Sequence, residues 1–154
     1  MKIAVFSDSH GELELMNSAV AGYRPDMVIH LGDFSGDAHE LKRKYPRIPF
    51  TIVRGNCDPV STDNITEFLS LGGSRVLITH GHMSQVRIDL LAIEYTARSA
   101  GADVALFGHT HEAIHTVNKG ITLFNPGAVS SYEKTSWGQI EISDNKLTFN
   151  ITEI

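Results

Sequence analysis

The sequence predicts an α/β protein in which two β-sheets pack on each other and helices cover their outer faces. In the first half of the chain, short apolar runs alternate with amphipathic stretches, which is typical of βαβ units on a parallel sheet. In the second half, short apolar runs come in pairs separated by turn residues, as in β-hairpins. No repeat or linker divides the 154 residues, so we expect a single domain over residues 1–154.

The first half is expected to contain three strands and two helices. The strands are the apolar runs 2–7, 27–31 and 50–54. Residues 12–23 carry apolar side chains at helical spacing and are followed by Pro25. Residues 37–45 are expected to form a short helix with a basic face that ends before Pro46. Because these elements alternate, the three strands are expected to lie parallel in one sheet.

The second half is expected to contain three hairpins, a strand and one long helix. The hairpins pair 65–71 with 76–80, 113–117 with 121–124, and 138–142 with 146–151. A helix is predicted over residues 85–100, because Val86, Leu90, Ile93 and Ala97 form one apolar stripe and Gly101 follows it. Residues 104–107 form a further buried strand. These elements predict the second sheet and a helix on its outer face.

The composition excludes several classes of protein. Apolar residues make up 42% of the chain and charged residues 20%, which is enough for a packed core and too apolar for disorder. Thirteen Lys and Arg against 18 Asp and Glu give a net charge of −5, which argues against stable nucleic-acid binding. No apolar run approaches the ~20 residues of a membrane span. The single cysteine, Cys57, excludes an intramolecular disulfide, so we expect a cytoplasmic protein.

Five polar clusters follow predicted strands. They are Asp8-Ser9-His10, Gly32-Asp33, Gly55-Asn56-Cys57-Asp58, His80-Gly81-His82 and Gly108-His109-Thr110-His111. Loops beyond the carboxyl ends of parallel strands converge on one crevice, so these clusters are expected to be neighbours in space. Carboxylate, amide oxygen and imidazole suit Mn²⁺, Fe²⁺, Ni²⁺ or Zn²⁺. Seven such side chains are too many for one tetrahedral ion but suit two ions that share a carboxylate.

Two metal ions about 4 Å apart form a site suited to in-line attack on phosphorus by a bridging hydroxide. The ordered series of clusters resembles the signature of the calcineurin-like metallophosphoesterases, over residues 1 to about 130. The short chain and the Asn-Cys-Asp sequence resemble the small single-domain phosphodiesterase branch of that family. The resemblance implies a four-layer α/β/β/α sandwich of two mixed sheets and a divalent-metal-dependent phosphodiesterase. The metal ligands that it implies are Asp8, His10 and His111 for one ion, Asn56, His80 and His109 for the other, and Asp33 as the bridge.

The sequence departs from the family pattern at Cys57, where many members carry a histidine that assists the leaving group. A thiol is a poorer acid near neutral pH, so we expect the enzyme to favour good leaving groups. The candidate catalytic residues are therefore Asn56 among the metal ligands, His82 as a substitute acid, and Asp58, which could orient a histidine or a water. The segment Asn125-Pro126-Gly127 also resembles a recurrent family segment and is expected to form a loop near the site.

The expected substrate is a small phosphate ester, and the expected cofactors are two divalent ions per chain, Mn²⁺ first and Ni²⁺, Zn²⁺ or Fe²⁺ as alternatives. Three other functions remain open: a phosphomonoesterase, a catalytically weak protein-interaction scaffold of the same fold, and, less favoured, a hydrolase with Cys57 as nucleophile. The absence of a Gly-x-Ser-x-Gly motif argues against a serine hydrolase. A homo-oligomer is also left open, with Trp137 and nearby Tyr132 as either core or contact residues.

Several other residues have simpler expected roles. His30 lies within an apolar strand and is expected to be a hydrogen-bonded core residue, and His39 is expected to be solvated on a helix. His115 either lies near the site or points outward from a strand. The basic run at 42–44 is expected to be a solvated helix face. The phenylalanines expected in the core are Phe68, Phe107 and Phe124.

Overall fold

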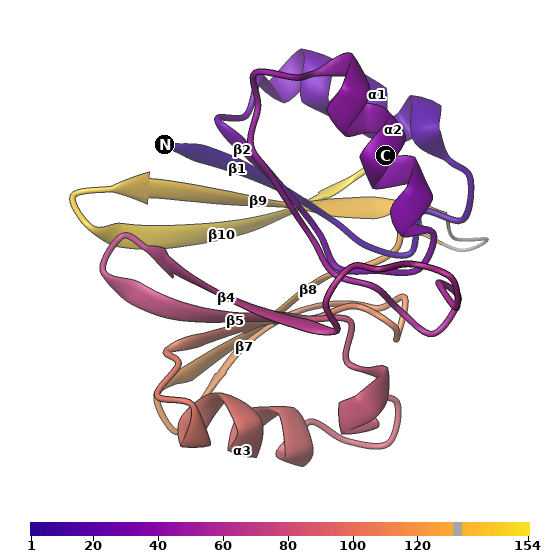
Figure 1. Cartoon of the computed structure of the whole chain (residues 1–154). Coiled ribbons are helices and arrows are strands. Elements are labelled where there is room, and N and C mark those ends of the chain that lie inside the picture. The colour runs from indigo at the N-terminus through magenta and orange to yellow at the C-terminus, as the bar shows by residue number, and fades with distance from the viewer. Residues whose placement is uncertain (131–133) are drawn as a thin grey trace.

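The computed structural model describes residues 1–130 and 134–154 and contains two five-stranded sheets (Figure 1). The first sheet has the strand order β10-β9-β1-β2-β3. Its strands are β1 (Lys2–Phe6), β2 (Met27–His30), β3 (Phe50–Ile52), β9 (Ser136–Ser143) and β10 (Lys146–Glu153). Strands β1, β2 and β3 are parallel, and β9 and β10 extend the sheet with antiparallel pairs.

The second sheet has the same mixture of parallel and antiparallel pairs in the order β4-β5-β6-β8-β7. Its strands are β4 (Thr66–Leu71), β5 (Ser74–Thr79), β6 (Val104–Leu106), β7 (Ala113–Asn118) and β8 (Ile121–Pro126). Strands β5, β6 and β8 are parallel, with β4 and β7 antiparallel at the edges. In each sheet three neighbouring strands are parallel, so their carboxyl ends lie together at one edge of the sheet.

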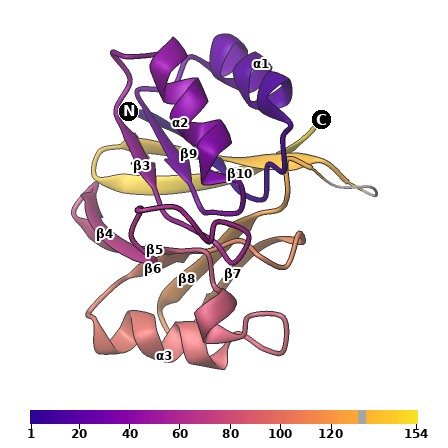
Figure 2. The same ribbon diagram turned by 45° about the vertical axis from the view of Figure 1, so that its right-hand side comes forward.

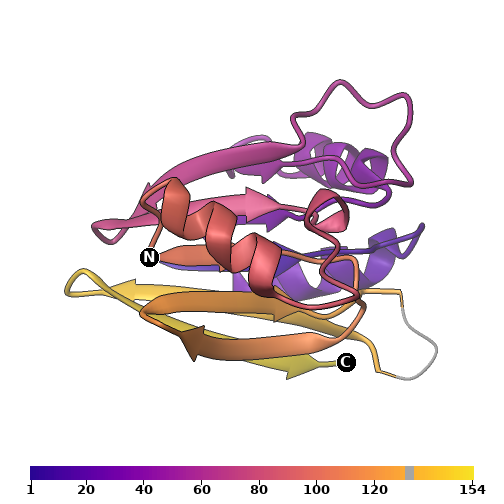
Figure 3. The same cartoon turned by 90° about the horizontal axis from the view of Figure 1, so that it is seen from below.

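The two sheets pack face to face, and the helices lie outside them (Figure 2). Helices α1 (Leu13–Tyr23) and α2 (Ser35–Lys44) cover the first sheet, and α3 (Leu91–Ser99) covers the second (Figure 3). On β1, Ile3 and Val5 face the core between the sheets, whereas Ala4 and Phe6 pack under α1 and α2. Burial of both faces explains why this strand is a continuous apolar run. The predicted α/β/β/α sandwich is confirmed.

The three predicted hairpins are present, and each turns through two residues with positive φ. The turns are Gly72 and Gly73, Lys119 and Gly120, and Asp144 and Asn145. Positive φ at both positions matches the right-handed twist of the paired strands. Glycine, asparagine and aspartate adopt this conformation at low cost, which explains why the turns are visible in the sequence.

The helix predicted over residues 85–100 is wrong in its first half. The chain forms a 3₁₀ turn, η1 (His82–Ser84), then an irregular loop, and α3 begins only at Leu91. Gln85 has a left-handed backbone (φ 50°), which interrupts the helix, and the Asp89 side chain accepts a hydrogen bond from the Leu91 N–H at 2.9 Å. Val86 is still buried, although it reaches the core from a turn. None of the helices in the described residues has the length and apolarity needed to cross a membrane.

The structure decides the expectations about six single residues. Phe68 is 39% exposed with the Arg75 guanidinium 4.8 Å above its ring, so its assignment to the core is wrong; it lies on the edge strand β4. Trp137 is buried and packs against Phe6 and Tyr23, which makes it a core residue.

His115 is an exposed residue of the edge strand β7, and it packs against the rings of Phe124 and Phe149, so its side chain lies on the face of the second sheet that packs on the first sheet. His39 lies on α2 as expected but is more than solvated, because its Nε2 lies 2.9 Å from the Asp63 carboxylate. Phe107 and Phe124 are fully buried, as predicted. Tyr132 lies outside the described residues.

Candidate metal centre

The polar clusters at the strand ends meet in two groups of metal-binding side chains. One group is Asp8, His10 and His111, and the other is Asp33, His80 and His109. Within each group the candidate ligand atoms lie within 4.8 Å of one another. The first group joins the loop after β1 to the loop after β6, and the second joins the ends of β2, β5 and β6. Both groups therefore draw ligands from both sheets.

Asp33 lies between the two groups. Its Oδ2 is 3.4 Å from Nε2 of His80, which belongs to its own group, and 3.9 Å from Nε2 of His10, which belongs to the other. Asp8 makes a second link, because its Oδ1 lies 3.2 Å from Nε2 of His111 and 3.9 Å from Nε2 of His80. The two groups thus form one continuous polar centre.

In both Asp8 and Asp33, one carboxylate oxygen accepts hydrogen bonds that fix the side chain, and the other oxygen faces the imidazoles. Oδ2 of Asp8 accepts hydrogen bonds from the Ser7 hydroxyl at 2.5 Å and from the His109 N–H at 3.0 Å. Oδ1 of Asp33 accepts a hydrogen bond from the Cys57 N–H at 2.8 Å. The remaining oxygens, Oδ1 of Asp8 and Oδ2 of Asp33, face the histidines, so both are preoriented to bind a cation.

His80 is fixed in the same way. This fully buried side chain donates from Nδ1 to the carbonyl oxygen of Leu31, at 2.8 Å. Nδ1 is thus committed to the carbonyl, and Nε2 points at Asp33 and at Nδ1 of His109, 3.2 Å away. A backbone carbonyl that fixes the tautomer of an imidazole is the usual outer support of a metal-binding histidine.

Two of the candidate ligand atoms are buried without a hydrogen-bond partner. They are Oδ1 of Asp8 and Nε2 of His10. A buried carboxylate oxygen or imidazole nitrogen without a partner costs about 1–3 kcal/mol, and native structures contain few of them. A divalent cation bound between these atoms would remove that cost. The donor set, with carboxylate oxygens and imidazoles and no thiolate, therefore fits the borderline divalent metals.

The backbone at the centre is strained. Asp8, His10, Asp33, His109 and His111 all have positive φ, between 42° and 70°. This left-handed region costs a residue other than glycine on the order of 1 kcal/mol, and such residues gather at functional sites. Because five of the six residues in the two groups carry this strain, the backbone there is shaped to aim side chains, at the expense of stability.

The charges of the centre follow from these contacts. Burial raises the pKa of the Asp8 and Asp33 carboxyls, but the neighbouring His111 imidazole at Asp8, and the His80 imidazole and the Cys57 N–H at Asp33, outweigh burial and leave each pKa lowered. Burial, together with the nearby charge of His80, lowers the pKa of His109 to about 4. At neutral pH both carboxylates are ionised and His109 is neutral, which are the forms that bind metals.

The remaining predicted site residues lie around this centre. Asn56 is exposed in the turn after β3, and its Nδ2 lies 3.4 Å from Sγ of Cys57. The His82 ring lies 5.4 Å from the His80 ring and 6.2 Å from the His109 ring, and its Nδ1 is buried without a partner. Asp58 is buried, and its two oxygens accept backbone N–H groups of Ser35 and Gly55, each at 2.8 Å.

Asp58 therefore has backbone partners for both oxygens and holds the first turn of α2 against the turn after β3. Its expected role in orienting a histidine or a water stays a prediction. Asn125 lies where the sequence places it, close to the centre, but at the end of β8 and not in a loop. Its Nδ2 donates to the Gly108 carbonyl and to the Thr110 hydroxyl, both at 3.0 Å, so it supports the loop that carries His109 and His111.

The sequence analysis missed three supports of the centre. Ser7 anchors Asp8, the Leu31 carbonyl fixes His80, and Arg87 donates from Nε to the His109 carbonyl at 3.1 Å. Ser7 and Leu31 stand next to motif residues, but the sequence does not show that the Ser7 side chain bonds to Asp8 or that the Leu31 carbonyl meets a residue 49 positions away. Arg87 falls in a segment predicted as helix, where an exposed arginine carries no sign of function.

The chain is similar to proteins of one family. The profile of the calcineurin-like phosphoesterase superfamily domain matches residues 1–145. A probable metallophosphoesterase, YsnB of Bacillus subtilis, is 35% identical over 132 residues, which cover 84% of this chain and 75% of the relative. A phosphodiesterase, MJ0936 of Methanocaldococcus jannaschii, is 27% identical over 151 residues, which cover 86% of each chain.

Solved structures have the same fold. A predicted phosphoesterase of Streptococcus pneumoniae superimposes with a TM-score of 0.79 at 25% identity, covering 99% of this chain and 88% of the other. Vps29 of Entamoeba histolytica, solved in complex with zinc, superimposes with a TM-score of 0.81 at 19% identity, covering 100% and 98%. These similarities agree with the two-sheet architecture described above.

Proposed function

Because the chain belongs to the calcineurin-like phosphoesterase superfamily, we propose that it is a phosphodiesterase that binds two divalent metal ions. The observation that carries the proposal is the pairing of two ligand groups around Asp33. Its Oδ2 atom lies within 3.9 Å of one histidine from each group, His10 and His80. Asp33 would bridge the ions. The other proposed ligands are Asp8, His10 and His111 at one ion and Asn56, His80 and His109 at the second.

When bound, two such ions would supply an activated water and a positive field for the phosphoryl oxygens of the substrate. The residues of the chain would provide the rest. The hydrogen bonds to Asp8 and Asp33 keep both carboxylates oriented before substrate arrives, so no reorganisation is required during the reaction. We propose His82 as the residue that gives a proton to the leaving group, because its ring lies 5.4 Å from that of His80 and its Nδ1 has no hydrogen-bond partner. Mn²⁺ is the proposed metal, with Ni²⁺, Zn²⁺ and Fe²⁺ as alternatives.

The preference for diesters over monoesters is supported by the relative MJ0936, a phosphodiesterase. The substrate is proposed to be a small phosphate ester, and the protein is proposed to act in the cytoplasm. The fold shared with Vps29 favours one alternative, a protein-interaction scaffold with little catalysis. The full set of ligands favours the enzyme, because a scaffold does not need seven side chains that can bind metals.

The decisive experiment measures hydrolysis of bis(p-nitrophenyl) phosphate and of p-nitrophenyl phosphate with each metal, with and without a chelator. We expect metal-dependent turnover, faster with the diester, and about two ions per chain by elemental analysis. His109→Ala should reduce turnover on the order of 100-fold while the protein stays folded. The matched control is His115→Ala, an exposed histidine on β7. Absence of turnover with every metal would contradict the enzyme and favour the scaffold.

A further inference from the structure

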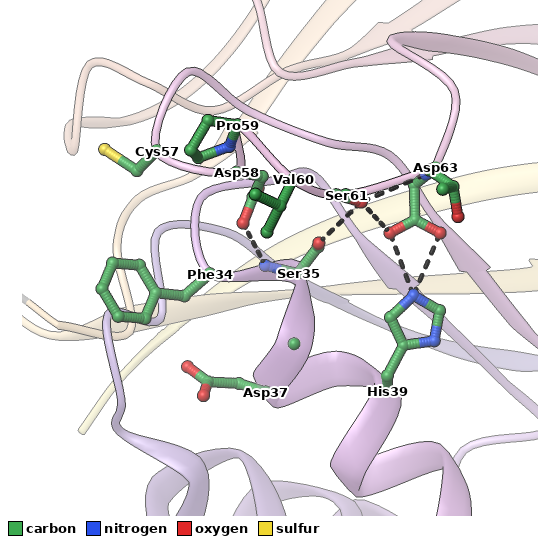
Figure 4. A pocket seen from close by; sticks show the side chains of 12 residues that line it. Phe34, Ser35, Asp37, His39, Cys57, Asp58, Pro59, Val60, Ser61 and Asp63 are labelled. Atoms are coloured by element: carbon green, nitrogen blue, oxygen red, sulfur yellow. Dashed lines mark hydrogen bonds and ion pairs between the residues drawn. The ribbon is translucent and has the colours of Figure 1, made fainter.

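A cavity of about 400 Å³ adjoins the metal centre, between the first turn of α2 and the loop 57–63 (Figure 4). Two of its lining residues also contact the centre. The Phe34 ring lies 4.9 Å from the ring of His10, and the Cys57 N–H donates to the Asp33 carboxylate. The volume is within the range of small-molecule sites, about 300–1,000 Å³. A molecule that places a phosphate at the metal centre can therefore extend into this cavity.

Phe34 is an unfavourable residue for the start of helix α2. It is the N-cap of α2, where serine, threonine, asparagine or aspartate would bond the helix, and its side chain makes no cap hydrogen bond. Its backbone is left-handed (φ 64°), which is costly for a bulky residue, and the side chain is 43% exposed. The exposed ring of Phe34 thus lies between His10 and the cavity, on a strained backbone, and does not stabilise the helix.

The opposite side of the cavity is also apolar and exposed. Pro59 is exposed, and Val60 is 93% exposed, although both line the cavity (Figure 4). Phe34 and Cys57 lie at one end in this view, and His39 and Asp63 lie at the other. Exposed apolar side chains that gather at a cavity beside a reactive centre are typical of a ligand-binding surface. A flat ring placed here would contact Phe34 on one face.

Each carboxylate of the lining has partners within the protein. Asp37 accepts from the Ser9 hydroxyl and the Gly11 N–H, and both oxygens of Asp58 accept backbone N–H groups. Asp63 pairs with His39. Recognition here would therefore depend mainly on apolar and aromatic contact.

The charges restrict the ligand further. The described residues that line the cavity include the three aspartates Asp37, Asp58 and Asp63 but no lysine or arginine. Arg54 lies behind the lining, where its Nη1 donates to the carbonyl of Ser61 at 3.1 Å. A second anionic group in the cavity would meet three carboxylates, whereas a neutral or cationic group would not be repelled.

We propose that this cavity binds the organic group of the substrate, and that this group carries an aromatic ring and no negative charge. The inference rests on the proposed function, since the phosphate is taken to lie at the metal centre. Phe34 determines specificity by stacking on the ring. The substrate class is then a phosphate ester of an uncharged or cationic aryl or heteroaryl alcohol, and esters with a further phosphate or carboxylate at that position are excluded.

The test is direct binding to the Mn²⁺-loaded protein, measured by isothermal titration calorimetry with methyl phosphate, phenyl phosphate and 4-carboxyphenyl phosphate. We expect phenyl phosphate to bind about tenfold more tightly than methyl phosphate, from ring burial and stacking. The added carboxylate should remove most of this gain. Phe34→Asn should lose the preference, so that the variant binds phenyl phosphate only as well as it binds methyl phosphate.

Phe34→Asn is chosen because asparagine tolerates the left-handed backbone and is a favoured N-cap, so its melting temperature should equal or exceed that of the parent protein. The matched control is Tyr95→Ala, which removes an aromatic side chain that is 72% exposed on α3 and should keep the tenfold preference. Equal binding of methyl and phenyl phosphate by the parent protein, or a preference that survives Phe34→Asn, would overturn the inference and leave the phosphoesterase proposal standing. Failure of all three esters to bind, together with no hydrolysis, would overturn both.

Discussion

The carbonyl oxygen of Leu31, at the end of β2 in the first sheet, accepts a hydrogen bond at 2.8 Å from Nδ1 of His80, at the end of β5 in the second sheet. The two residues are 49 positions apart. This bond fixes both the orientation and the tautomer of a buried imidazole, and it can form only when the two sheets are packed in the native arrangement. Formation of the metal centre is thus a consequence of the sheet-on-sheet packing.

Asp33→Asn should reduce the metal content below two ions per chain and lower phosphodiesterase activity at least about 100-fold. The asparagine oxygen can still accept the Cys57 N–H, so the fold should be retained, but the charge shared by the two ligand groups is lost. Elemental analysis and turnover of bis(p-nitrophenyl) phosphate measure the two effects. A variant with two ions and normal turnover would show that Asp33 is not the bridge.

Gly108→Ala should destabilise the protein by about 2 kcal/mol and impair metal binding. A Cβ at this position would lie 1.8 Å from the Ser7 hydroxyl oxygen and 2.9 Å from Oδ2 of Asp8, so the anchor of the Asp8 carboxylate must move. The control is Gly22→Ala in α1, where nothing lies within 4 Å of the new Cβ and the helix should gain up to about 1 kcal/mol. Urea unfolding checks both, and equal midpoints for the two variants would contradict the prediction.

The stability of the metal-free protein should fall as the pH decreases from about 6.5 to about 4. Burial lowers the pKa of His30 from 6.5 to about 4, so in this range the unfolded chain binds a proton that the folded chain does not. Below this pH range the titration of His30 lowers the free energy of unfolding by on the order of 3 kcal/mol, and above pH 6.5 this loss is absent.

His30→Gln provides the comparison for this pH effect. The variant loses the hydrogen bonds of the imidazole to Ser9 and Gly32 and should be less stable at pH 7, but the titrating group is gone. The difference in unfolding free energy between parent and variant should therefore shrink as the pH falls from 6.5 to 4. Chemical denaturation at several pH values, with a chelator present, gives this difference. A constant difference would mean that His30 titrates normally in the folded state.

His82→Ala should slow the hydrolysis of alkyl esters at least about tenfold and leave p-nitrophenyl esters nearly unchanged. A nitrophenolate leaves without a proton, whereas an alkoxide needs one, and the unpartnered Nδ1 of His82 lies beside the centre. The measurement is turnover against the pKa of the leaving group, with His115→Ala as control. If both variants show the parent dependence for every ester, His82 is not the acid.

Cys57→Ser should change turnover by no more than about threefold. Burial, and a hydrogen bond with Asp33, raise the pKa of the Cys57 thiol to about 11, so almost no thiolate exists at neutral pH and the side chain is a poor nucleophile. Steady-state kinetics of the variant, and slow alkylation of the parent protein by iodoacetamide, check this. Complete loss of activity in the serine variant would instead favour the alternative in which Cys57 attacks the substrate.

Much of the architecture follows from local patterns in the sequence. The strand β1 is readable because both of its faces are buried, and the turn at Gly72-Gly73 is readable because positive φ restricts the residue types. The helix over residues 85–100 was predicted too long because its apolar stripe is real, but Val86 reaches the core from a turn. Periodicity reports which side chains are buried and does not report the backbone that buries them.

The sequence alone therefore determined which residues are candidates for the polar centre: Asp8, Asp33 and the histidines of the motifs stand at strand ends, and strand ends are defined by neighbours in the chain. It did not determine how they are grouped. That Asp8 meets His111, and that Asp33 meets His80, depends on how the two sheets pack, because these contacts join residues about 50 to 100 positions apart in different sheets. The exposed ring of Phe34 beside the cavity was likewise decided only by the tertiary structure, because a strained backbone leaves no mark on residue periodicity.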